Sequence, residues 1–107
     1  MTPGTKPASL DENGVLKCPR CDQLYLHRGE VLVFDRNEDD PFVAVTRVKT
    51  GMVVSAKAKN HRSGNPSPRR DGVSIVFNCE TCDHGGTEQY LNIVQHKGET
   101  FIYWDAE

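Results

Sequence analysis

The chain of 107 residues predicts an all-β protein, a small antiparallel sheet or meander closed by its cysteines. Short runs of alternating apolar and polar residues recur along the chain, and no stretch of ten or more residues carries a helical apolar stripe. Gly, Pro, Asn and Asp separate these runs and favour turns. Two matched Cys-x-x-Cys pairs lie far apart in the chain, which suits a clamp between strands.

The first element is a predicted flexible tail, residues 1–14. It contains Pro3, Gly4, Pro7, Asn13 and Gly14 and has no periodic apolar pattern. We therefore expect a disordered N-terminal tail, followed by a single domain over residues 15–107.

Strand-like sequence begins after the first cysteine pair. Apolar residues between Leu24 and Arg36 are interrupted by Gly29, which predicts either two short strands or one bulged strand. Residues 37–41 have the composition of a turn.

A β-hairpin is predicted over residues 42–55. The segment from Phe42 to Val48 is rich in β-branched residues, Thr50 and Gly51 favour a tight reversal, and Met52 to Ser55 return on the other side. Residues 57–71, the basic segment, lack apolar periodicity and contain Gly64, Pro66 and Pro68, so we expect a long loop there.

The C-terminal part predicts three more strands. Val73, Ile75 and Phe77 alternate with other residues and run into Cys79, and Leu91 and Ile93 alternate in the same way. In the last strand, 100–104, Phe101 and Tyr103 share one face, and Ile102 and Trp104 share the other. Because both faces are apolar, homo-oligomerisation through a sheet edge is a live hypothesis.

Composition excludes a membrane protein. The longest apolar runs have four residues, against the roughly 20 that a spanning helix needs. The N-terminal residues show no apolar stretch after a basic start, so we expect no secretory signal and a cytoplasmic protein. In that compartment four cysteines are better explained as metal ligands than as disulfides.

Cys18, Cys21, Cys79 and Cys82 are predicted to bind one zinc ion. Two residues between cysteines let one tight turn direct both thiolates at one ion, and two such turns complete a tetrahedral shell. Four thiolates leave no position for a catalytic water, so the expected zinc is structural, one per chain. Two redox-active dithiol pairs or unbound buried thiols are the alternatives, and His84 could compete as a ligand.

These knuckles resemble the zinc-ribbon family, in which two cysteine turns at the ends of β-hairpins hold a metal between them. Two features depart from that pattern: Asp22 and Asp83 stand where the knuckle usually has glycine, and 57 residues separate Cys21 from Cys79. Asp can adopt the left-handed geometry that glycine supplies. The chain also resembles small uncharacterised cysteine-knuckle proteins of phages and actinobacteria, a resemblance that implies no established activity.

Charge divides the chain into three parts. Residues 1–40 hold eight acids and five bases, residues 71–107 hold seven acids and one base, and residues 41–70 hold seven bases and no acid. The candidate binding residues lie in the basic segment: Lys57, Lys59, His61, Arg62, Arg69 and Arg70. Such a segment either binds a partner or compensates the acidic parts of its own fold.

Three functional hypotheses follow. The leading one is a zinc-stabilised β module that binds nucleic acid or an acidic protein surface through the basic segment, with phosphate contacts from its cations, Ser and Asn. The second is a structural protein that self-associates through a sheet edge. The third is a metal-dependent nuclease that uses His61, although Asn60 stands where an acid is expected.

Overall fold

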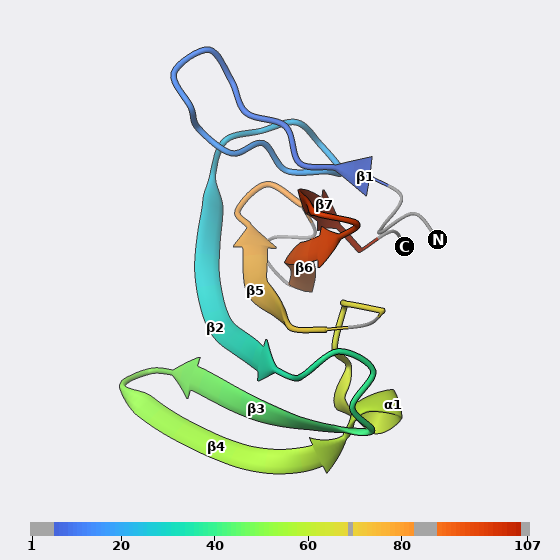
Figure 1. The fold of residues 1–107 in the computed structure, drawn as a ribbon. Coiled ribbons are helices and arrows are strands. Elements are labelled where there is room, and N and C mark those ends of the chain that lie inside the picture. The colour runs from blue at the N-terminus through green and yellow to red at the C-terminus, as the bar shows by residue number, and fades with distance from the viewer. Residues whose placement is uncertain (1–5, 69, 83–87, 106–107) are drawn as a thin grey trace.

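The computed structural model describes residues 6–68, 70–82 and 88–105. The elements of these residues are β1 (Lys6–Pro7), β2 (Leu26–Asp35), β3 (Phe42–Lys49), β4 (Met52–Lys59), α1 (Asn60–Ser63), β5 (Gly72–Cys79), β6 (Glu88–His96) and β7 (Glu99–Trp104). Over the described residues, the strands form one sheet in the order β1-β7-β6-β5-β2-β3-β4 (Figure 1), and each neighbouring pair is antiparallel. The predicted all-β class is therefore confirmed. No helix of these residues has the length and apolar character to cross a membrane.

Strand β2 lies inside the sheet, between β5 and β3. Its register against β5 shifts between Arg28 and Val31, so the sequence around Gly29 forms one bulged strand and not two short ones. A bulge adds a residue to one strand and increases the local twist. Strand β2 curves from the cysteine pairs at one end of the sheet to the β3–β4 hairpin at the other (Figure 1).

The β3–β4 hairpin is longer than the predicted range 42–55. Thr50 and Gly51 both have positive φ, 49° and 78°, the geometry of a two-residue hairpin turn. Pairing then continues as far as Phe42 and Lys59. The expected loop over residues 57–71 was therefore wrong at its start, since Lys57 to Lys59 belong to β4 and Asn60 to Ser63 form α1.

Alternation explains that extension of β4. Ala58 packs against the apolar core while Lys57 and Lys59 on either side of it are exposed. A small residue such as alanine is a weak hydrophobic signal, so the sequence pattern did not reveal this strand.

The apolar core lies on one face of the sheet. Its buried cluster comprises Leu32, Phe34, Val43, Val45 and Val76, from β2, β3 and β5. Alternation places these side chains on a common face. Beside this cluster, Ser74 donates a hydrogen bond to Asn92 and Asn92 donates one to Asp105, both at 2.5 Å, so two buried polar side chains are paired.

The aromatic residues of β7 are buried on both faces of that strand. Tyr103 is 6% exposed and Trp104 is 1% exposed, and Trp104 meets Phe77 edge to face, with ring centroids 5.7 Å apart. Ile102 is 47% exposed, so the face of β7 that Ile102 shares with Trp104 is only partly covered.

The N-terminal segment is held from Lys6 onward, earlier than the predicted start at residue 15. Strand β1 pairs with β7, the Ala8 amide donates to the carbonyl of Ile102 at 3.0 Å, and the Lys17 amide donates to that of Ser9 at 2.9 Å. Pro7 fits this edge because an edge strand does not need every amide as a donor. Residues 1–5 of the expected tail lie outside the described residues. Because β1 pairs with β7, the edge strands of the described sheet are β1, with two residues, and β4, with eight.

Candidate metal centre and basic segment

The first cysteine pair forms a tight turn. The Asp22 amide donates to the Cys18 carbonyl at 3.0 Å, and the Arg20 amide donates to the Cys18 sulfur at 3.4 Å. Asp22 has φ of 61°, so it takes the left-handed conformation expected for the residue that replaces glycine. The corresponding Asp83 lies outside the described residues.

Pairing of β2 with β5 brings the second pair to the first. Cys79 is the last residue of β5 and lies opposite Leu26, and the Glu80 amide donates to the Tyr25 carbonyl at 2.9 Å. The chain turns there, so Cys82 follows beside Cys79. The ladder between two central strands thus closes the 57-residue gap between the pairs.

The four sulfurs form one cluster. All lie within 4.8 Å of one another, with Sγ to Sγ distances of 3.7 Å between Cys18 and Cys82 and 3.5 Å between Cys21 and Cys79. Sulfurs around a tetrahedral ion with metal–sulfur bonds of about 2.3 Å are roughly 3.8 Å apart, whereas a disulfide bond measures about 2.05 Å. The cluster therefore has the spacing of a four-thiolate metal site, and its cysteines are free thiols.

Polar side chains surround the sulfurs. The Thr81 hydroxyl lies 3.2 Å from the sulfurs of both Cys21 and Cys79, and the buried amide of Gln89 donates to Cys18 at 3.3 Å. Donors to thiolate orient the ligands of a metal site and stabilise their charge. Sequence reasoning missed Gln89, because its place on β6 is adjacent to Cys18 only in the folded sheet.

Electrostatics in the cluster favour a bound cation. The hydrogen bond from Thr81 lowers the pKa of Cys21. Burial raises the pKa of Cys79, but hydrogen bonds from Thr81 and the Cys82 amide outweigh it and bring that pKa to about 6. Hydrogen bonding with Cys21 and burial raise the pKa of Cys82. Because the protein alone does not stabilise four adjacent thiolates, a metal ion that binds here releases protons. His84 lies outside the described residues.

Comparison of the chain with protein-family models, with curated proteins and with solved structures finds no match.

The basic segment lies at the opposite end of the sheet from the sulfurs. Its described cations and histidine are exposed and come from three elements: Lys57 and Lys59 from β4, His61 and Arg62 from α1, and Arg70 from the turn before β5. Arg69 lies outside the described residues. Strand β5 connects this end to Cys79, so the structure does not bring His61 to the metal cluster as a nuclease site would require (Figure 1).

Asn65 organises the turn of the basic segment. Its side-chain amide donates to the Asn60 side chain and to the Arg70 carbonyl, both at 2.9 Å, and its oxygen accepts from the Ser67 amide at 3.0 Å. Ser63 donates to the Asn60 carbonyl at 2.8 Å. The small polar side chains expected to contact phosphate are thus used within the segment itself, which leaves the cations to face outward.

Lys57, Lys59, Arg62 and Arg70 of the basic segment form no ion pair with the acids of the described residues. In residues 6–68, 70–82 and 88–105 the ion pairs are His27 with Glu80 and Arg47 with Glu30, both at 3.4 Å. Lys57 instead places its ammonium 5.0 Å from the ring centroid of Phe42. Sequence reasoning missed this ring because Phe42 belongs to another strand.

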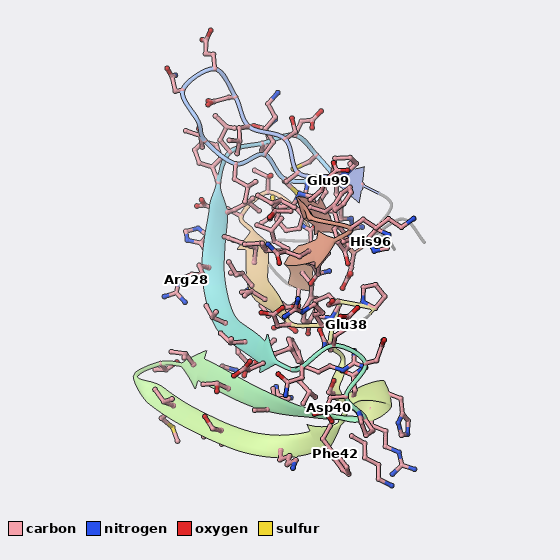
Figure 2. The ribbon with its side chains drawn as sticks, viewed as in Figure 1. Arg28, Glu38, Asp40, Phe42, His96 and Glu99 are labelled. Carbon is pink, nitrogen blue, oxygen red and sulfur yellow. The ribbon has the colours of Figure 1, made fainter. Side chains whose placement is uncertain are left out.

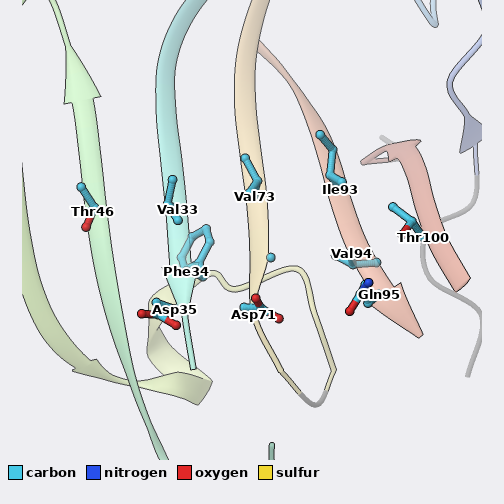
Figure 3. Close-up of a pocket in the computed structure, with 11 residues that line it drawn as sticks. Val33, Phe34, Asp35, Thr46, Asp71, Val73, Ile93, Val94, Gln95 and Thr100 are labelled. Carbon is cyan, nitrogen blue, oxygen red and sulfur yellow. The ribbon is translucent and has the colours of Figure 1, made fainter. Parts of the chain in front are cut away.

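A shallow hollow of about 440 Å³ lies on the face of the sheet opposite the core cluster (Figure 3). Apolar side chains from adjacent strands form its floor, among them Val33, Val73 and Ile93, and Asp35 and Asp71 stand at one end. Val33 is 39% exposed. This face presents β-branched side chains to the surroundings.

Proposed function

We propose that the chain is a small zinc-stabilised β module that binds nucleic acid through the basic segment. The zinc ion is structural: the thiolates of Cys18, Cys21, Cys79 and Cys82 complete its shell and leave no position for a substrate. Thiolate donors at this spacing suit Zn²⁺, which has no redox chemistry and accepts tetrahedral geometry. The metal stabilises the sheet, and contact with the partner takes place at its other end.

The unpaired cations carry this proposal. A segment that only compensated the acids of its own fold would form ion pairs with them, and Lys57, Lys59, Arg62 and Arg70 form none with the described residues. Their side chains extend from β4, α1 and the turn before β5, and Asn65 links the start of α1 to that turn through Asn60 and Arg70. Several lysine and arginine side chains on a fixed backbone suit the regularly spaced phosphates of a nucleic acid.

Metal analysis and a nucleic-acid titration test the two parts of the proposal separately. We expect one zinc per chain, and binding whose affinity falls steeply as salt rises because each phosphate contact releases a counterion. Charge reversal of Lys59 and Arg62 should abolish binding at moderate salt. Lys49→Glu is the matched control, because Lys49 is an exposed base at the other end of β3 and should affect binding only weakly.

Two results would overturn the proposal in different ways. No zinc in untagged protein would remove the metal part. A protein that holds zinc but does not bind DNA or RNA at low salt would overturn the proposal that it binds nucleic acid. Binding to polyglutamate in that second case, lost on reversal of Lys59 and Arg62, would assign an acidic protein as the partner.

Self-association through β4 is the second candidate function. Strand β4 is an edge strand of eight residues, and its side chains Met52, Val53 and Val54 are 68%, 66% and 52% exposed. Such an edge can pair with a second copy and extend the sheet. Sedimentation should then detect a dimer that Val54→Pro disrupts and that charge reversal of Arg62 leaves intact. A strict monomer at high concentration would eliminate this candidate.

A further inference from the structure

The ring of Phe42 lies beside the basic segment, although 14 residues separate Phe42 from Lys57 in the sequence. Phe42 is 42% exposed. It lies at the open end of the β3–β4 hairpin, next to α1 (Figure 2). The ammonium of Lys57 lies 5.0 Å from its ring centroid, a cation–π contact. An exposed aromatic ring among cations is the combination that binds unpaired bases together with their phosphates.

Strand pairing fixes this arrangement. Phe42 is the partner of Lys59 across the ladder, and Ala44 is the partner of Lys57. Residues at i and i+2 share a face of a strand, so Phe42, Lys57 and Lys59 share the face opposite the core, with Lys59 directly across from Phe42 and Lys57 diagonal to it. The Asn60 amide donates to the Pro41 carbonyl at 2.8 Å, which fixes the start of α1 beside Phe42.

The core does not require this ring. Val43, the next residue, is 1% exposed and fills the core position of that strand end, while Phe42 points to the other face by alternation. The ring therefore adds little apolar contact to the buried cluster. Its packing partner is a lysine, which leaves part of the aromatic face accessible.

Charged groups of both signs surround the ring of Phe42. A hollow of about 250 Å³ beside Phe42 and Lys57 is lined by Asp35 and Asp40 and also by Arg36, and the Asp40 carboxylate accepts from the Phe42 amide at 2.9 Å. His61 and Arg62 are exposed on α1, which follows directly after Lys59 and has no acidic residue in its first turn. A phosphate backbone that contacts both Lys59 and Arg62 therefore runs along the start of α1.

We propose that Phe42 stacks on an unpaired base of a single-stranded nucleic acid while Lys59 and Arg62 contact the neighbouring phosphates. This inference rests on the proposed nucleic-acid function and specifies its substrate as single-stranded. A duplex offers the same cations its phosphates, but its bases are already stacked on one another and paired, so the ring gains no partner there.

Anisotropy titrations with a labelled twelve-nucleotide oligothymidine and a twelve-base-pair duplex test the inference. The wild-type chain should bind the single strand more tightly than the duplex. Phe42→Leu should weaken single-strand binding about tenfold and leave its salt dependence unchanged, because stacking releases no counterion. Arg62→Gln should reduce the salt slope by about one instead. Tyr25→Leu is the matched control, since Tyr25 is 58% exposed and lies at the cysteine end.

Phe42→Trp gives a direct signal for stacking. Trp104, the chain's single tryptophan, is 1% exposed, so a tryptophan at position 42 is the accessible fluorophore. Single-stranded oligonucleotide should quench it and duplex should not. Stacking would be overturned if single strand and duplex bound equally, if Phe42→Leu left binding unchanged and if Phe42→Trp showed no quenching. The proposed function would stand in that case if charge reversal of Lys59 and Arg62 still weakened binding. No binding to either oligonucleotide would overturn the proposed function first.

Discussion

The two ends of the sheet are stabilised by different interactions. At the cysteine end, which comprises residues 18–26, 77–82 and 89, four sulfurs and their polar neighbours Thr81 and Gln89 form the packed centre. At the hairpin end, which comprises β3, β4, α1 and the adjoining halves of β2 and β5, the buried apolar cluster forms the packed centre. A domain of this size has limited apolar surface to bury, and a structural metal supplies folding free energy where that surface is lacking.

This difference also separates stability from binding. The hairpin end has apolar packing on one face, and the exposed cations Lys57, Lys59, Arg62 and Arg70 contribute little to the fold, since they form no ion pairs with the described residues. At the cysteine end, Cys18 and Cys79 are buried and Cys21 and Cys82 are partly buried. We therefore expect that charge can be varied at the hairpin end without loss of structure, whereas exchange of a single cysteine disturbs the sulfur cluster.

Loss of a metal ligand should have the largest effect. Cys79→Ser removes a buried thiolate, and structural zinc contributes about 10 kcal/mol or more, comparable to the whole stability of a small domain. We expect zinc content to fall and the near-ultraviolet dichroism of Trp104 to disappear. Thr81→Val, which removes a hydroxyl near two sulfurs and no ligand, should keep the metal. Full native dichroism in metal-free Cys79→Ser would show that the cysteine end packs without metal.

Phe34→Ala tests the hairpin end. Phe34 is 2% exposed in the core cluster, and truncation of a buried phenylalanine costs about 3–5 kcal/mol. Urea unfolding should reveal that loss, while the folded variant still holds one zinc. Phe42→Ala is the control, and its cost should be much smaller because Phe42 is 42% exposed. If Phe34→Ala also released zinc under native conditions, the two ends would fold as one cooperative unit.

A gain of stability is expected at the hairpin turn. Thr50 has φ of 49°, a region that costs a β-branched residue about 1–2 kcal/mol and that asparagine tolerates. Thr50→Asn creates an Asn-Gly turn and should raise the free energy of unfolding by about 1 kcal/mol. Thr100→Asn, in strand β7, should give no gain. An unchanged thermal midpoint for Thr50→Asn would mean that the turn at Thr50 and Gly51 has already unfolded before the rest of the protein does.

Tyr103 links β7 to the turn before β5, and its effect should be the smallest. Its hydroxyl donates to the Pro66 carbonyl at 3.3 Å, and burial, followed by the charge of Asp105, raises its pKa above the usual 10.0. The folded state thus favours the neutral phenol, so this contribution is constant below pH 10 and is lost as pH rises through the folded pKa.

Ultraviolet difference titration should detect one late tyrosine that Tyr103→Phe removes. At neutral pH the variant should lose about 1 kcal/mol or less. A Tyr103→Phe profile identical to wild type above pH 10 would contradict the assignment.

Local patterns were sufficient for much of the fold. The strands around Phe34 and Val45 and the reversal at Thr50 and Gly51 follow from alternation and turn chemistry within about ten residues. At Gly29 the sequence left two short strands or one bulged strand open, and pairing with β5 decided for the bulge. The end of β4 did not follow from local patterns, because Ala58 gives a weak apolar signal, and neither did β1, whose stability depends on the free edge of β7. The cluster of four cysteines followed from residue type and spacing alone, since two such pairs in an all-β chain are typical of a shared metal site.

The sequence by itself thus determined the β class, the pairing of four cysteines in one candidate site and the concentration of cations in one segment, because each depends on residue type and short-range spacing. Only the tertiary structure determined which side chains are neighbours. It placed Gln89 beside the sulfur of Cys18, Asn65 at the centre of the basic segment and the ring of Phe42 beside Lys57. Such neighbours depend on which strands pair and in which register, and that choice is made by burial and backbone hydrogen bonding over the whole sheet.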